Sequence, residues 1–232
     1  MKSVIYQDSM LFHPPELGSV LFLPGLPGGG NKIYDRSPYG SIGTLSGAVW
    51  TKTPGGVPCL SFDGVDDYVT IANVPSLQII GDLTLKAWAR STNYTPKFPL
   101  FNKNVMREYA LVLNSTASPN GRVRFWHGDG SSYELLVDVS NILPIVNTWF
   151  HIALVRASSV KRCYLYINGI LKYTSDVYVL TPAISTSDLW LGKDSSGYAV
   201  GNMALAEIHR RAWQALDVQN SFNREKSVFG VW

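Results

Sequence analysis

The first residues that could do chemistry are Asp63, Asp66 and Asp67, which gather at one tight acidic corner. Carboxylate oxygens are the ligands that a hard cation such as calcium prefers. Aspartates in turns also accept hydrogen bonds from nearby backbone amides, and this is their commoner role. A calcium ion would need further oxygens from distant loops, where only scattered aspartates are candidates. We therefore favour turn capping over calcium binding at this corner.

The spacing of the other acidic and histidine residues does not predict a hydrolase. Glycosidases place two carboxylates beside the scissile bond, and carboxylates two residues apart on a strand could do so because alternate residues share one face. Every glutamate of this chain lacks an aspartate two residues later, and there is no Gly-x-Ser-x-Gly turn. His209 shares a strand face with Glu207, which predicts a structural ion pair, and His151 lies in an apolar strand. We expect no enzyme activity.

Three predicted loops combine an aromatic side chain with polar groups, which is what a sugar-binding site requires. These loops span residues 93–98, 126–133 and 193–198. Their candidate ligand-binding residues are Tyr94, Trp126, His127, Asp129, Tyr133, Asp194 and Tyr198. Aromatic residues inside apolar strands usually belong to the core, and on this ground we assign to it Phe62, Trp149 and Trp190.

Short strands separated by turns must position these loops. In residues 60–71, two alternating segments flank the acidic corner, which predicts a strand, a tight turn and a second strand. Asn168 and Gly169 lie between two further predicted strands and are the strongest short-range hairpin signal. Only residues 213–226 show an amphipathic helical pattern. Such even strand spacing predicts one all-β domain, a two-sheet antiparallel sandwich with a short C-terminal helix.

Composition excludes several classes of function. The 232 residues carry 20 basic and 17 acidic side chains without a basic cluster, which argues against nucleic-acid binding. No apolar run reaches the roughly 18 residues of a membrane span, and polar residues and prolines interrupt any N-terminal signal peptide. Cys59 and Cys163 are predicted to point in different directions, so we expect two free thiols.

Several segments follow one another in an order typical of a known family. They read S-F-D-G-V-D-D-Y-V, D-L-T-L-K-A-W, N-T-W-F-H-I-A-L-V-R, C-Y-L-Y-I-N-G, L-W-L-G and G-N-M-A-L-A-E-I-H-R-R-A. Together they resemble laminin-G-like domains of the concanavalin A-like lectin/glucanase superfamily, over residues 21–229. The resemblance implies a jelly-roll sandwich. The segments D-R-S-P-Y-G-S-I-G-T-L-S-G-A-V-W and S-V-F-G-V also resemble sequences of bacteriophages and environmental viruses.

This resemblance implies a non-catalytic recognition domain that binds a glycan or cell-surface polysaccharide, on a virion surface or elsewhere outside the cell. The competing class is a purely structural virion protein, such as a capsid decoration or fibre component, which binds only neighbouring capsid or tail subunits. In relatives the last strand carries an Asp–Glu pair, whereas Ala206 precedes Glu207 here. We therefore expect no cofactor, with calcium considered and disfavoured.

The two ends of the chain are apolar. We expect residues 1–17 to form an N-terminal extension and residues 18–232 to form the jelly-roll domain. The extension and residues 228–232 contain apolar side chains that a sandwich does not need, so they should cover a surface. That surface is either their own domain or a second copy of the chain. We favour a homo-oligomer with the extension at the contact.

Overall fold

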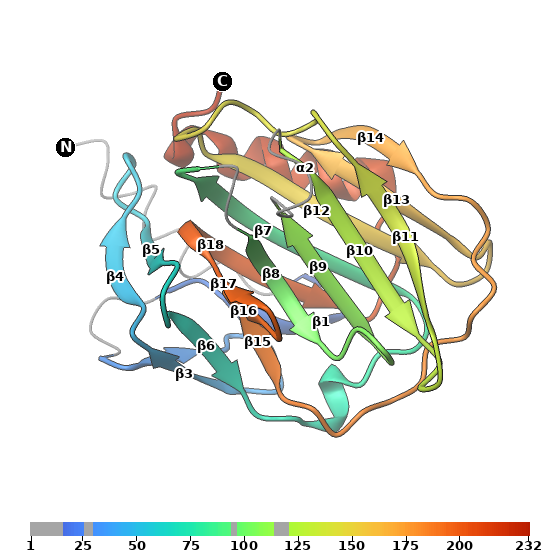
Figure 1. Cartoon of the computed structure of the whole chain (residues 1–232). Helices are drawn as coiled ribbons and strands as arrows, with labels where there is room; N and C mark the ends of the chain where they lie inside the picture. Colours follow the sequence, from blue (N-terminus) through green and yellow to red (C-terminus); the bar gives the residue numbers. More distant parts are fainter. Residues whose placement is uncertain (1–15, 26–29, 94–96, 114–120) are drawn as a thin grey trace.

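Two large antiparallel sheets pack face to face in the computed structural model (Figure 1), which describes residues 16–25, 30–93, 97–113 and 121–232. The first sheet runs in the order β14 (Ile170–Thr174), β13 (Arg162–Ile167), β12 (Phe150–Ala157), β7 (Leu83–Ser91), β18 (Val200–His209), β5 (Pro58–Asp63) and β4 (Val49–Lys52), and β1 (Ser19–Leu23) also pairs with β18. The predicted two-sheet sandwich is confirmed.

The second sheet carries the surface on which the candidate site lies. Its order is β11 (Tyr133–Val139), β10 (Val123–Gly128), β9 (Tyr109–Leu113), β8 (Phe98–Lys103), β15 (Leu189–Leu191), β6 (Tyr68–Ile71), β3 (Ile42–Ser46) and β2 (Lys32–Tyr34). A separate hairpin, β16 (Lys193–Asp194) and β17 (Gly197–Tyr198), follows β15. The helical elements are η1 (Pro75–Leu77), α2 (Ala215–Glu225) and η2 (Lys226–Phe229). Among the described residues, no helix is long and apolar enough to cross a membrane.

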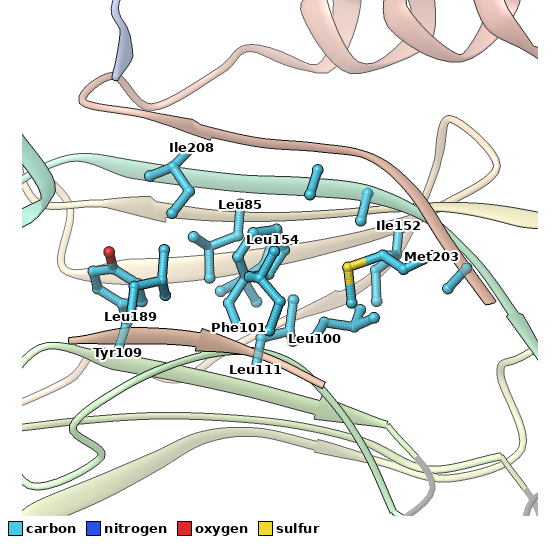
Figure 2. Packing of buried hydrophobic residues seen from close by; sticks show 14 of the residues in the cluster. Leu85, Leu100, Phe101, Tyr109, Leu111, Ile152, Leu154, Leu189, Met203 and Ile208 are labelled. Atoms are coloured by element: carbon cyan, nitrogen blue, oxygen red, sulfur yellow. The ribbon is translucent and has the colours of Figure 1, made fainter. Parts of the chain in front are cut away.

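The core lies between the two sheets. Figure 2 shows Leu85, Leu154 and Ile208 of the first sheet facing Phe101 and Leu111 of the second. Alternate residues of a strand point to opposite faces, so the inner positions of these strands form one continuous apolar layer. Burial of a leucine or phenylalanine side chain stabilises the fold by about 1.5–3 kcal/mol. This layer fixes the register of the strands and thereby determines which residues reach the outer faces.

The acidic corner connects the two sheets. The predicted strands of residues 60–71 are β5 and β6, but they do not pair with each other, because β5 belongs to the first sheet and β6 to the second. The predicted hairpin at Asn168 and Gly169 joins β13 to β14, and both residues have positive φ. Cys59 and Cys163 are buried free thiols, as predicted.

Helix α2 covers the face of the first sheet that points away from the second (Figure 1). It begins with a capping box in which Asp217 accepts a hydrogen bond from the Gln214 backbone at 2.8 Å. Its Glu225 accepts hydrogen bonds from Lys86 Nζ and Trp88 Nε1 of β7, both at 2.6 Å. Figure 2 shows the helix on the far side of the first sheet from the core. The helix predicted over residues 213–226 is confirmed.

The contact between α2 and the first sheet contains a buried ionic cluster. Lys86 has no solvent exposure and also lies 2.7 Å from Glu207, which in turn lies 3.0 Å from His209 Nε2. Burial disfavours the charge of Lys86, but the two carboxylates raise its pKa above the usual value. Glu207 and His209 lie in hydrogen-bond contact, as their shared strand face predicts, and His151 is buried in the same layer.

Candidate functional site

Four strands of the second sheet place a row of side chains on its outer face. Trp126 of β10 is the cross-strand partner of Ala110, Ala110 of Asn102, and Asn102 of Trp190. Residues that are directly opposite in neighbouring strands project from the same face. Three strand spacings separate the two tryptophans, which corresponds to about 14 Å between their backbones. Two aromatic residues therefore stand at the ends of a row whose middle positions are small.

This row forms the floor of a surface groove with a volume of about 590 Å³. Volumes of about 300–1,000 Å³ are typical of small-ligand sites. The groove is lined by Lys97, Asn102, Asn104, Val105, Ala110, Val112, Trp126, Tyr133, Ser187, Asp188, Trp190, Asp194, Ser195 and Ser196. It thus combines aromatic surfaces with hydroxyl, amide, ammonium and carboxylate groups, which is the composition that binds a polar ligand with apolar faces.

The β16–β17 hairpin closes one end of the groove. Lys193 Nζ lies 4.1 Å from the centre of the Tyr68 ring, 4.9 Å from that of Trp190 and 5.4 Å from that of Tyr198. Cation–π attraction acts within about 6 Å, so the ammonium group holds the three rings together. Lys97 pairs with Asp194 at 3.3 Å and also donates to Ser196. These contacts fix the orientation of Trp190 and of the carboxylate before any ligand arrives.

Two buried charged residues hold the opposite wall. Glu108 accepts hydrogen bonds from the backbone and hydroxyl of Ser185, at 2.6 and 3.1 Å. Lys103 donates to the backbone oxygen of Ser187 at 2.7 Å and lies 3.6 Å from Glu108. Burial lowers the pKa of Lys103 and raises that of Glu108. Asp188 accepts a hydrogen bond from the Asn73 backbone at 2.9 Å, which ties the wall to the loop after β6.

The described part of the chain includes six of the seven residues predicted from the sequence for ligand binding. Trp126, Tyr133 and Asp194 line the groove, and Tyr198 lies beside it, 6.2 Å from the ring of Tyr68. Tyr94 lies outside the described residues. The loops at residues 126–133 and 193–198 therefore do come together, although a long stretch of sequence separates them.

His127 and Asp129 have other roles. His127 is fully buried, hydrogen-bonds Glu134 at 3.4 Å and lies edge-on to the Tyr178 ring at 4.8 Å. Asp129 Oδ1 accepts hydrogen bonds from the backbones of Ser131 and Ser132, both at 2.8 Å, and so shapes a turn. Neither side chain lines the groove, because the alternation that exposes Trp126 directs His127 inward. We leave both residues out of the proposed site.

A family model matches residues 63–219, more than half of the chain, and is described as the concanavalin A-like lectin/glucanase superfamily. The chain belongs to this superfamily. A comparison with curated protein sequences finds no match. The family assignment confirms the resemblance inferred from the sequence segments.

Several solved structures share the fold of this superfamily member. The binding domain of paraclostridial mosquitocidal protein 1 is 18% identical, with a TM-score of 0.69 over 89% of this chain and 52% of that one. A structure of botulinum neurotoxin type C, whose cell entry depends on two ganglioside molecules, is 16% identical, with a TM-score of 0.68 over 91% and 51%. The binding domain of botulinum neurotoxin DC, in complex with rat synaptotagmin II, is 15% identical, with a TM-score of 0.69 over 91% and 52%. The chain thus aligns with about half the length of each of these proteins.

Trp190 is the groove residue that the sequence interpretation placed elsewhere. We assigned it to the core of the sandwich, but it is half-buried and lines the groove. Leu189 and Leu191 on either side of it are buried and occupy the inward positions of β15. The alternation Leu-Trp-Leu could have indicated that Trp190 faces outward, because consecutive residues of a strand point to opposite faces and cannot all enter the same core. The sequence analysis also did not name Asn102, Lys97 and Asp188 as ligand-binding candidates, although all three line the groove.

The acidic corner of this lectin/glucanase sandwich is compact. One ligand atom from each of Asp63, Asp66 and Asp67 lies within 4.8 Å of the others. Asp67 Oδ2 accepts a hydrogen bond from the Asp63 backbone, and Asp63 Oδ1 accepts one from Val65, both at 2.8 Å. Burial raises the pKa of Asp67. At least two of the three carboxylates therefore stabilise the turn, which is the role that we favoured from the sequence.

Proposed function

We propose that this protein is a non-catalytic carbohydrate-binding domain and that its ligand lies in the groove between Trp126 and Trp190. The cross-strand row of these two residues with Ala110 and Asn102 is the observation that carries the proposal. Sugar rings have an apolar C–H face that packs on an indole ring and hydroxyl groups that need fixed partners. The groove offers both features in one place.

The polar groups of the groove suit hydroxyl groups in particular. Asp188 and Asp194 can accept hydrogen bonds, and the Asn102 amide can both donate and accept them. The carboxylates already have backbone or ion-pair partners, at 2.9 Å from Asn73 for Asp188 and 3.3 Å from Lys97 for Asp194. Preorganised groups reduce the entropy cost of binding. The sequence also lacks the paired-carboxylate strand motif of a hydrolase.

The comparisons favour recognition over catalysis. Two of the three similar structures are named as binding domains, one of them in complex with synaptotagmin II, and the third belongs to a toxin whose cell entry depends on two ganglioside molecules. Gangliosides are glycolipids, so sugar recognition by one such protein agrees with our proposal for this chain. The alternative to a glycan ligand is a protein ligand in the same groove. Display of this domain on a virion surface is a separate proposal that rests on the sequence resemblance.

A glycan array tests the proposed site. Trp126→Ala and Trp190→Ala should each abolish binding to every glycan that the unaltered protein captures, because each removes one aromatic platform. Tyr39→Ala is the matched control, since Tyr39 is 54% exposed and does not line the groove. Thermal unfolding of all three variants should stay close to that of the unaltered protein. Absence of any bound glycan, or full binding by both tryptophan variants, would refute the proposal.

We also propose self-association through the apolar ends of the chain. Leu17 is 84% exposed and Trp232 is 91% exposed in the single chain. Burying such side chains in a contact between copies would remove apolar surface from water. Light scattering should give the mass of an oligomer for the full chain and of a monomer for a chain that spans residues 18–231, which lacks both side chains. A monomeric mass for both would contradict this proposal.

A further inference from the structure

A second hollow continues the groove beyond its wall. It has a volume of about 340 Å³ and is lined by Gln78, Asn104, Arg107, Ile184, Ser185, Thr186 and Ser187. Asn104 and Ser187 line both hollows, and the Asn104 amide donates a hydrogen bond to the Ser187 hydroxyl at 3.1 Å. This pair forms a ridge between the two hollows. A ligand that fills the groove and is long enough to cross the ridge reaches the second hollow directly.

The two hollows differ in charge. Asp188 and Asp194 line the groove together with Lys97, whereas the second hollow is lined by one charged residue, Arg107. Arg210 adds a second guanidinium nearby, because its Nη2 donates to the backbone oxygen of Gln78 at 3.0 Å. The groove therefore suits neutral hydroxyl groups, and its continuation suits an anion.

The Arg107 guanidinium retains capacity to bind such an anion. One of its nitrogens donates to the backbone oxygen of Ile184 at 3.3 Å. Among the described residues, none has a carboxylate in ion-pair contact with Arg107. A guanidinium has five N–H donors in a planar fork that matches carboxylate and sulfate-type oxygens. The side chain is only half-buried, so its charge is accessible from solvent.

The neighbouring wall is rigid, which makes it suitable for recognition. Glu108 and Lys103, both without solvent exposure, hold the backbone at Ser185 and Ser187 from beneath. The backbone amide of Ala183 donates to the Arg107 and Gly128 carbonyl oxygens, at 3.2 and 3.1 Å. The segment that separates the two hollows is thus tied to the second sheet, and binding would not have to order it.

We infer that the ligand is an extended acidic oligosaccharide, with neutral rings in the groove and an anionic substituent in the second hollow at Arg107. The anionic substituent is either the carboxylate of a sugar acid or a sulfate ester, since both offer the oxygens that a guanidinium binds. This inference rests on the proposed carbohydrate-binding function and adds the class of glycan to it.

The test uses a glycan array of matched sets, in which each neutral chain is printed beside the same chain with one sulfate ester and the same chain ending in one carboxylated sugar. The unaltered protein should bind at least one acidic form about fivefold more tightly than the neutral form, as a partly exposed ion pair provides. Arg107→Gln should remove this preference and leave the neutral chain bound as before. Arg107→Lys keeps the charge and should retain part of the preference, and Arg36→Gln is the control at an exposed arginine that lines neither hollow.

The outcomes separate this inference from the proposed function. Capture of neutral and acidic chains with equal affinity, or a preference that persists in Arg107→Gln, would refute the acidic-ligand inference and leave carbohydrate binding intact. Capture of no chain at all would refute both. Preference for the carboxylated form alone, or for the sulfated form alone, would support the inference and identify the source of the charge. The preference should also weaken as salt is raised from 50 to about 500 mM, because salt screens an exposed ion pair.

Discussion

Replacing Glu225 by glutamine should detach helix α2 from the first sheet at a measurable cost. The Glu225 carboxylate accepts one hydrogen bond from the Lys86 ammonium and one from the Trp88 indole, each at 2.6 Å. The Glu225 side chain is almost fully buried. Glutamine has the same shape but only one acceptor oxygen, so its amide nitrogen must face one of the two donors. One of the two donors then loses its acceptor on residue 225, and if that donor is Trp88 no acceptor remains for it among the contacts shown.

The expected cost follows from these contacts. An unsatisfied buried donor costs about 1–3 kcal/mol, and a hydrogen bond to a charged group contributes about 1.5–3 kcal/mol. Lys86 keeps Glu207 at 2.7 Å, so the full penalty of an unpaired buried charge does not arise. We therefore expect Glu225→Gln to lower the free energy of unfolding by about 2–4 kcal/mol. For a chain of this size this corresponds to a decrease in melting temperature of roughly 6–12 °C.

Glu16→Gln is the matched control, because Glu16 pairs with Arg224 at 2.7 Å near the surface. Such pairs contribute about 0–1 kcal/mol, so its melting temperature should fall by no more than about 3 °C. Urea unfolding at pH 7, followed by circular dichroism and tryptophan fluorescence, gives both free energies. If Glu225→Gln unfolds within about 1 kcal/mol of Glu16→Gln, the buried cluster does not hold the helix and the reasoning is wrong.

Three further predictions concern His127, the two cysteines and the acidic corner. Burial and the Arg156 charge lower the pKa of His127 from 6.5 to about 4. Because the unfolded chain takes up the proton at higher pH than the folded protein, the contribution to stability that is present above pH 6.5 is lost as the pH falls towards 4. In His127→Gln the urea concentration at the midpoint of unfolding should therefore depend less on pH across this range. Burial raises the pKa of Cys59 and Cys163 to about 12, so a thiol reagent at pH 8 should label neither in the folded protein and both in urea, and rapid labelling without urea would contradict their burial. Thermal unfolding should give the same midpoint in EDTA and in millimolar calcium, whereas a calcium-dependent rise that disappears in Asp66→Asn would identify the acidic corner as a binding site.

The sequence was sufficient to predict the architecture because strand periodicity and turn chemistry are local. Alternation around residues 60–71 and the turn residues Asn168 and Gly169 predict strands and a hairpin without knowledge of any distant contact. Local patterns do not assign strands to sheets, however. Nothing local indicates that β5 and β6 lie in different sheets, since that depends on which partners each strand finds.

The groove depends on such distant partners. Asn102, Ala110, Trp126 and Trp190 form one row only because β8, β9, β10 and β15 pair in a particular register. The sequence pointed to Trp126 and Tyr133, whose neighbours are turn residues and which both line the groove, but it could not indicate that Trp190 lies on the same surface. Lys86 illustrates the same limit. Its alternating strand predicts an outward position, which is correct, but only the fold shows that α2 covers this position and buries the charge.

The position of β18 has a consequence for how the protein is made. This strand lies within the first sheet and pairs with β1, β5 and β7, although it follows all of them in the chain by more than a hundred residues. Ribosomes add about 5–20 residues per second. The synthesis of β18 therefore follows that of its three partner strands by on the order of ten seconds. During that time their unpaired edges can join those of other nascent chains. The first sheet is therefore expected to be completed only after β18 has been synthesised, and chaperones that shield strand edges should raise the yield of folded protein.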